Sequence, residues 1–231
     1  AKAEKDGKDA PARPAITQAM QSYLDLHRYG VVRLAVIARP ADALRLMIAH
    51  AIAASGNWRV SPDHAAVRAD AIGESLAKSA AQAVFADEAK AVKALLAPAL
   101  KGTPNGSGVS GRGCGDDDTT VKVFRHLLTL KDKEVARIAA LVMAETLASG
   151  SAVTDAFGEH AGVEARKHWT PDPVFFELLR DRASTSAMLA EIAGKKEADR
   201  LVSAKLKDLK DDLAAAAAKS KDWRPGWMRF P

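Results

Sequence analysis

The spacing of the apolar residues restricts this chain to helices. Near its beginning, one apolar face repeats every three to four residues, at Ile16, Met20, Tyr23, Leu24 and His27. That repeat is the period of an α-helix. Alanine, which has the highest helix propensity, is very abundant, and clusters of β-branched residues are nearly absent apart from Val31-Val32. The sequence therefore predicts an all-α fold, a multi-helix bundle.

Glycine and proline mark the expected ends of the helices. Gly30 is expected to end the first helix, and a second run over 31–38 stops before Pro40, because the residue before a proline disfavours helical geometry. The run over 41–55 is apolar nearly all round, which predicts a place in the middle of the bundle. A helix start is predicted at 61–63, where Ser, Pro and Asp follow one another. Further helical patterns cover 79–100, 120–130, 133–149, 151–157, a run from Asp172, 185–192 and 197–218.

A Gly-rich segment divides the chain. Residues 101–119 hold six glycines separated by Ser, Asn, Pro and Asp, and this composition favours a flexible loop because it offers little apolar area to bury. The predicted organisation is a disordered linker at 1–13, a front helical subdomain at 14–100, the Gly-rich loop at 101–119, and a rear helical subdomain with an aromatic C-terminal tail at 120–231. The loop is either a linker between two subdomains or a long loop within one domain.

Charge and cysteine content limit the class of protein. The 34 basic and 29 acidic residues give a net charge of +5, which permits contact with nucleic acid but does not require it. The single cysteine, Cys114, excludes an internal disulfide framework and favours a reducing compartment. The sequence has no apolar run long enough to cross a membrane and no apolar signal core at its beginning. We therefore expect a cytoplasmic protein.

The sequence lacks the motifs that carry catalysis or hold a cofactor. Its six histidines are spread out, and none has the spacing of a zinc motif. The glycines at 106–111 lack the preceding strand of a phosphate loop or nucleophile elbow. We predict no catalytic residue, no cofactor, no metal ligand and no small-molecule substrate. The alternative is an enzyme, which would need acids such as Glu145, Glu159 and Asp172 to converge around a metal.

Four residues outside the C-terminal segment are candidates for a pocket or an interface. His50 lies on the apolar run 41–55, where a hydrogen-bonded core histidine is commoner than a ligand. Glu145 is expected to form a structural pair with an arginine such as Arg137. Trp58 and Trp169 complete the group.

The C-terminal segment combines basic and aromatic side chains. Its basic residues are candidate nucleic-acid contacts, because such side chains neutralise phosphates: Lys219, Lys221, Arg224 and Arg229. Its large aromatic residues are Trp223, Trp227 and Phe230. Their burial is favourable enough that we expect them to dock onto the bundle, with docking onto a second subunit as the alternative.

Residues 153–169 have a weak likeness to a DNA-reading helix-turn-helix. The spacing of Gly158 and Gly162 fits the turn of such a motif. The would-be recognition helix at 164–168 is cut short by the prolines at 171 and 173, although reading base edges needs about two to three helical turns.

Seven segments, spread over nearly the whole chain after residue 12, carry a family resemblance. They are 13–24, 43–53 (ALRLMIAHAIA), 56–60 (GNWRV), 142–153 (VMAETLASGSAV), 175–182 (FFELLRDR), 187–194 (AMLAEIAG) and 227–231 (WMRFP). Together they resemble the long C-terminal region of ParB-like partition proteins (the ParB/RepB family), of the large type found in α-proteobacteria and their plasmids. The Gly-rich segment and residues 183–186 depart from the family pattern.

The resemblance implies a role in DNA partition or plasmid maintenance. In that family a domain with an Arg-rich nucleotide box and then a helix-turn-helix precede this region, and this sequence holds neither. The chain is therefore expected to be a fragment, associated with nucleoid or plasmid, to which nucleotide handling and site-specific DNA reading cannot be assigned. We expect it to self-associate, as a homodimer or otherwise, and to support DNA binding by the missing domains. The first alternative is direct, non-specific DNA binding through the basic C-terminal segment. The second, which the resemblance also implies, is a nuclease-type enzyme.

Overall fold

The structure, a computed structural model, describes residues 15–52, 57–58, 70–100, 109–110, 117–201, 203–220 and 222–230, with only the backbone at 45, 48–52 and 117–120. Within these ranges the chain forms α-helices and two short 3-10 helices, and no strand. The helices are α1 (Gln18–Ile37), α2 (Pro40–Ile52), α3 (Asp70–Ala77), α4 (Ala80–Leu96), α5 (Asp117–Leu127), α6 (Asp132–Thr146), α7 (Ala152–His160), η1 (Ala165–Lys167), α8 (Pro173–Leu178), α9 (Arg182–Ala193), α10 (Lys195–Arg200), α11 (Leu206–Lys219) and η2 (Gly226–Met228). The predicted all-α, multi-helix fold is confirmed.

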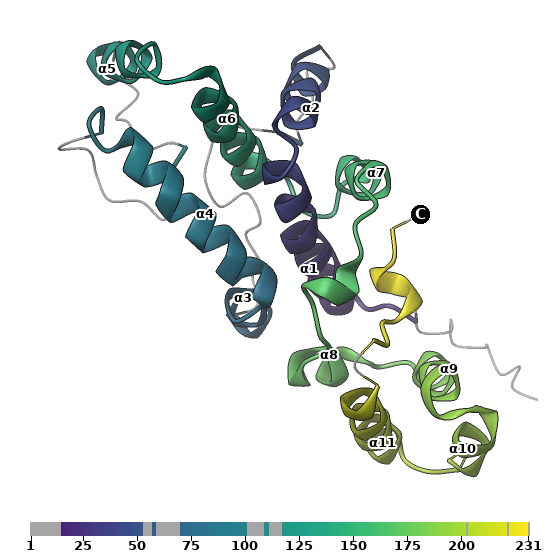
Figure 1. Ribbon diagram of the computed structural model, residues 1–231. Coiled ribbons are helices and arrows are strands. Elements are labelled where there is room, and N and C mark those ends of the chain that lie inside the picture. Colours follow the sequence, from purple (N-terminus) through teal and green to yellow (C-terminus); the bar gives the residue numbers. More distant parts are fainter. Residues whose placement is uncertain are drawn as a thin grey trace, which may run out of the picture.

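Helix α1 lies at the centre of the fold (Figure 1) and packs against α2, α3, α4, α6, α7 and α8. The predicted helix end at Gly30 is wrong, because α1 runs without a break to Ile37. A Cβ at position 30 would lie 2.9 Å from Cδ1 of Leu76 on α3. The glycine therefore serves close packing between α1 and α3 and does not end the helix.

Three of the predicted helix starts are confirmed by their caps. Ser79, Ser151 and Asp172 are the N-cap residues of α4, α7 and α8, and each side chain accepts a hydrogen bond from a backbone N–H in the first turn. The predicted start at 61–63 lies outside the described residues.

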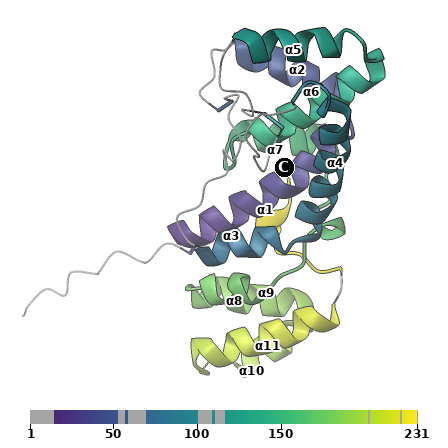
Figure 2. The same ribbon diagram turned by 90° about the vertical axis from the view of Figure 1, so that its left-hand side faces the viewer.

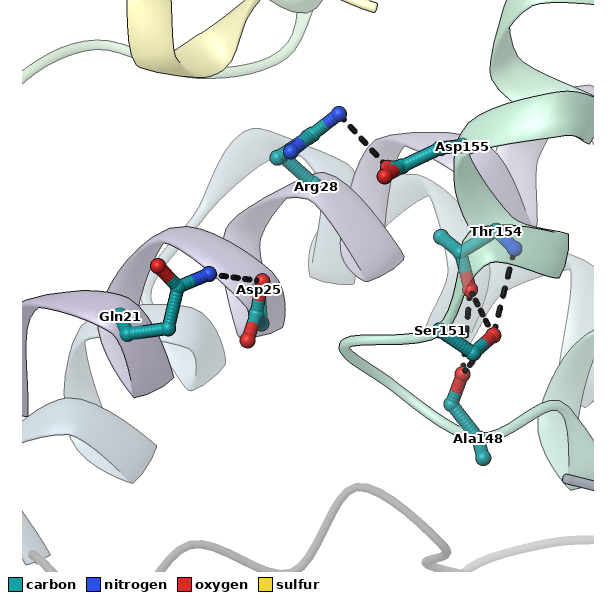
Figure 3. A network of polar contacts seen from close by, with 7 residues as sticks. All are labelled: Gln21, Asp25, Arg28, Ala148, Ser151, Thr154 and Asp155. Atoms are coloured by element: carbon teal, nitrogen blue, oxygen red, sulfur yellow. Dashed lines mark hydrogen bonds and ion pairs between the residues drawn. The ribbon is translucent and has the colours of Figure 1, made fainter. Parts of the chain in front are cut away.

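Helix α7 is fixed to α1 by polar contacts (Figure 3). The Arg28 guanidinium on α1 lies 2.6 Å from the Asp155 carboxylate on α7. At the beginning of α7, the Thr154 hydroxyl donates to the carbonyl oxygen of Ala148 at 3.1 Å, and Ser151 caps the helix. The loop before α7 and the first turn of α7 are thereby held in one orientation against α1.

The last helices form a separate layer below the main bundle (Figure 2). Helices α9, α10 and α11 pack mainly on one another, and α8 links them to α1 and α3. The predicted single helix over 197–218 is wrong, because α10 ends at Arg200 and α11 begins at Leu206. The Arg182 guanidinium donates to the carbonyl oxygens of Leu201 and Ala204, so it satisfies the backbone acceptors at this break.

One buried apolar cluster joins residues from both sides of the Gly-rich segment. It includes Tyr23 and Leu76 from the front half and Leu141 and Phe175 from the rear half. The parts of 14–100 and 120–231 that the structure describes therefore share one core. Of the segment 101–119 itself, residues 101–108 and 111–116 lie outside the described residues.

Candidate functional site

A polar network surrounds the carboxylate of Asp172, between α1, α3 and α8. The Tyr23 hydroxyl donates to Asp172 Oδ1 at 2.8 Å, and the Ser75 hydroxyl donates to Asp172 Oδ2. Asp172 Oδ1 also accepts from the backbone N–H of Phe175 at 2.9 Å, which is the N-cap bond of α8. Asp172 thus joins the start of α8 to two other helices.

Two further side chains extend the network. His27 Nε2 lies 2.8 Å from Ser75 Oγ, and the Trp169 indole N–H donates to the Tyr23 hydroxyl at 3.3 Å. Tyr23 and His27 are four residues apart on α1 and therefore lie on the same face of that helix. The predicted candidate Trp169 belongs to this cluster and is 3% exposed.

Burial sets the protonation of the network. Desolvation, and then the nearby Asp172 charge, raise the pKa of Tyr23 well above its ordinary value. Desolvation lowers the pKa of His27 to about 4, against the opposing influence of Asp172. At neutral pH the network therefore contains a neutral phenol and a neutral imidazole.

The order of the groups differs from that of a hydrolytic triad. In a triad the acid orients the histidine, and the histidine takes the proton of the serine. Here the acid, Asp172, accepts the hydrogen of Ser75, and His27 contacts Ser75 from the other side. Because a hydroxyl has one hydrogen, Ser75 must accept from His27 Nε2–H. His27 is thus placed as a hydrogen-bond donor to Ser75 and not as its base.

A cavity of about 520 Å³ opens beside this network. His27, Ser75, Trp169 and Asp172 form part of its lining. The lining also includes charged side chains on α3, just after α3 and at 166–167, namely Glu74, Lys78, Arg166 and Lys167. The cavity therefore combines a mainly apolar wall, which contains the buried polar groups of the network, with a charged opening.

Tyr23, His27 and Ser75 are not among the site residues predicted from the sequence. Tyr23 and His27 belong to an apolar helix face in the sequence pattern, and the available signal was that two hydrogen-bonding side chains lie one turn apart on that face. Their partner Asp172 is 149 residues from Tyr23 along the chain, and local patterns do not encode such a pairing.

Glu145 has a different partner from the one predicted. Its carboxylate accepts from the backbone N–H groups of Val109 and Ser110, with Val109 N at 2.9 Å from Oε2. Arg137 instead pairs with Glu88 on α4, with its Nε 2.5 Å from Glu88 Oε1. The predicted Glu145–Arg137 pair is therefore wrong. The buried Glu145, near the end of α6, faces the backbone at 109–110, and the more exposed Arg137 faces α4.

Trp58 also lies at the end of α6. Its indole N–H donates to Thr146 Oγ1 at 2.6 Å, and its backbone forms a bridge with Leu147. His50 lies on α2, but its side chain is outside the described residues. Among those residues, no three His, Cys, Asp or Glu side chains meet as a metal site would require, so Glu145, Glu159 and Asp172 do not converge there.

The predicted nucleic-acid contacts differ in exposure. Lys219 is exposed at the end of α11, and Arg229 is exposed with its guanidinium 4.0 Å from Glu191. Arg224 is 8% exposed and donates to the carbonyl oxygen of Arg166 at 3.0 Å. Burial of its guanidinium against the protein removes Arg224 from the outward position that a phosphate contact needs. Lys221 lies outside the described residues.

The aromatic residues of the C-terminal segment pack against the apolar core of the same chain. The Trp223 indole N–H donates to Glu191 on α9 at 3.1 Å. The Phe230 ring packs on Gly158 of α7 and lies 5.0 Å below the Arg28 guanidinium. Trp227 is partly buried against the same core. These contacts attach the segment to both the main bundle and the lower layer.

The segment 153–169, which has the weak likeness to a helix-turn-helix, does not form a second α-helix after α7. After α7, the chain turns at Gly162, which has a φ of 59°, and then forms only the short η1 helix. A recognition helix of about two to three turns is therefore not formed between 160 and 173.

Comparisons with models of known protein families, with curated proteins and with solved structures give no match to this chain. The likeness to ParB-like proteins therefore stays a prediction from the seven segments. In the part of the chain that the structure describes, none of the helices has the length and apolar content needed to span a membrane.

A second candidate surface lies on α5, at the edge of the fold (Figures 1 and 2). Three of its apolar side chains are exposed: Val121 by 41%, Phe124 by 59% and Leu128, just after the helix, by 69%. They are spaced by three and four residues and therefore form one stripe, called the α5 stripe below. A hydrogen bond of 2.8 Å between His126 Nε2 and the carbonyl oxygen of Leu95 ties α5 to α4.

Proposed function

We propose that this chain is a non-catalytic, helical assembly region of a ParB-like DNA partition protein, and that two copies of the chain associate through the α5 stripe. The partition context rests on the resemblance of the seven segments. The assembly role rests on one observation, the exposure of Val121, Phe124 and Leu128 along α5.

The α5 stripe has the chemistry of an unpaired interface. Apolar residues at helical spacing are normally turned toward a core, and here Phe124 and Leu128 are more than half exposed. Spacings of three and then four residues also form the seam between two packed helices. Covering such a side chain removes apolar area from water and stabilises a complex by about 1 to 3 kcal/mol for each residue fully buried.

Charge along the helix favours a second copy as the partner. α5 begins with Asp117-Asp118, whereas its last turn carries Arg125. Two copies of α5 packed antiparallel, with Val121 of each opposite Phe124 of the other, would bring the acidic first turn of each toward Arg125 of the other. The resulting interface is isologous, because the same stripe is used by both partners.

The experiment is a measurement of molar mass by sedimentation equilibrium at about 100 μM, where a dimer with a dissociation constant on the order of 1 μM is the main species. The unchanged chain is expected to sediment as a dimer. Phe124→Asp and Leu128→Asp should sediment as monomers with unchanged circular dichroism, since a buried unpaired charge opposes association.

Leu44→Asp is the matched control, because Leu44 is a 52% exposed apolar residue on a different helix, α2. This variant should remain dimeric. A monomeric unchanged chain would refute assembly, and a Phe124→Asp variant that stays dimeric would refute the α5 stripe as the interface.

A further inference from the structure

We propose that the cavity beside Asp172 binds a small molecule of the amino-acid class, with its ammonium group at the Asp172 wall and its carboxylate at the opening. The proposal is independent of self-association, since the cavity is formed by α1, α3, the start of α4 and residues 166–174, away from the α5 stripe.

The wall carries a negative charge that the described residues do not balance. Asp172 accepts three hydrogen bonds, from Tyr23, Ser75 and the backbone of Phe175, and all three donors are neutral. Among the described side chains, no cation forms an ion pair with Asp172. A half-buried carboxylate of this kind is stabilised by a cation that enters the cavity.

The neighbouring groups accept hydrogen bonds as well. Ser75 gives its one hydrogen to Asp172, so the short contact between Ser75 and His27 must use a hydrogen on His27 Nε2. His27 Nδ1 is then an acceptor in the neutral ring. A ligand ammonium group, with three donors, matches the acceptor groups that this wall contains.

The opening of the cavity carries the opposite charge. Lys78, Arg166 and Lys167 line it, and their side chains are 77%, 54% and 62% exposed. Among the described residues, they pair with two carboxylates, Glu74 and Glu164. Exposed ion pairs contribute little stability, so these cations can turn to a ligand carboxylate at small cost. Opposite charges at the two ends of the cavity select a zwitterion over a simple amine or a simple acid.

The volume agrees with this class of ligand. Ligand pockets generally measure about 300 to 1,000 Å³, and the cavity at about 520 Å³ lies in the lower half of that range. The Trp169 ring supplies an apolar surface in the lining, against which the carbon chain between the two charged groups can pack.

The test is a nuclear magnetic resonance titration of the Trp169 indole N–H, which donates to Tyr23 within the network. Its resonance is assigned with Trp169→Phe. The probes are the ω-amino acids glycine, β-alanine, γ-aminobutyrate and ε-aminocaproate, each at up to about 10 mM, which occupies most of a site whose dissociation constant is on the order of 1 mM. The N-acetyl derivatives and the corresponding alkylamines are the matched controls.

At least one ω-amino acid is expected to shift the resonance saturably. Its N-acetyl derivative lacks the cation and is expected to leave the resonance unchanged. Asp172→Asn should weaken binding at least about tenfold, since it removes the charge while asparagine remains a good helix cap. A titration in which no ω-amino acid shifts the resonance overturns the proposal, as does equal binding by the N-acetyl form or by Asp172→Asn.

The opening is tested separately, which keeps the proposal falsifiable if Asp172→Asn does not fold. The double variant Lys78→Glu and Lys167→Glu reverses two of these charges. It should weaken the binding of the ω-amino acid more than the binding of the alkylamine of the same length. The matched control is Lys133→Glu, at an exposed lysine on α6 outside the cavity lining. Equal binding of the ω-amino acid by the double variant and the control overturns the proposal.

Discussion

Replacing Asp172 with alanine removes all three hydrogen bonds that this carboxylate accepts. The cap of α8 is lost, and the buried hydroxyls of Tyr23 and Ser75 lose their acceptor. A lost cap costs about 1 kcal/mol, and each buried hydroxyl left without a partner costs about 1 to 3 kcal/mol, so Asp172→Ala should lower the free energy of unfolding by roughly 3 to 7 kcal/mol.

The assay is urea unfolding followed by circular dichroism, supported by the thermal midpoint, which for a chain of this size moves by about 2 to 4 °C per kcal/mol. Asp181→Ala is the matched control, because Asp181 caps α9 by accepting from the backbone N–H of Ser184 at 2.7 Å. It should cost only about 1 kcal/mol. The difference between the two variants measures the two orphaned hydroxyls of Tyr23 and Ser75.

Equal loss of stability in Asp172→Ala and Asp181→Ala would refute this reasoning. It would mean that Tyr23 and Ser75 find other partners at no cost, and that the network does not fasten α8 to the bundle. Asp172→Asn should lie between the unchanged chain and Asp172→Ala, since its side-chain oxygen can still accept from Phe175.

Two more predictions concern pH and glycine. The pKa of His27 falls from its ordinary 6.5 to about 4 on folding. Between these pH values the unfolded chain binds a proton at His27 and the folded chain does not. The free energy of unfolding should therefore fall by roughly 3 kcal/mol as the pH drops from about 6.5 to about 4. In His27→Gln, the free energy of unfolding measured with urea should depend less steeply on pH across that range. An equally steep dependence on pH in this variant would contradict the prediction. Gly158→Ala would place a Cβ 2.7 Å from Cγ of the Phe230 ring and should expose the C-terminal segment to carboxypeptidase, whereas Gly73→Ala, with nothing within 4 Å, should stabilise by about 0.5 to 1 kcal/mol. Equal digestion of the two glycine variants would show that the ring does not depend on Gly158.

The class of fold and most helices could be predicted from the sequence. Helix formation depends on hydrogen bonds four residues apart and on caps formed by adjacent residues, and both are visible in a local pattern. This is why Ser79, Ser151 and Asp172 were recognised as helix starts.

Local patterns failed where another part of the chain determined the outcome. Gly30 has the residue type of a helix end but lies inside α1, because Leu76 packs against it from α3. The apolar pattern over 197–218 continues through the break between α10 and α11. At this break the Arg182 guanidinium donates hydrogen bonds to backbone carbonyl groups. In both places a contact across the fold outweighed the small free-energy differences of helix propensity.

The sequence by itself determined that this chain is helical and where most of its helices begin, because those properties arise within a few residues. Only the tertiary structure decided that Tyr23, Ser75 and Asp172 share one network, and that the α5 stripe lies outside the core. Both facts depend on which helices meet, and partners as distant as Tyr23 and Asp172, 149 residues apart, leave no periodic trace in a sequence. A helical pattern shows that a face is apolar, but the packing of the whole chain decides whether that face is buried or exposed.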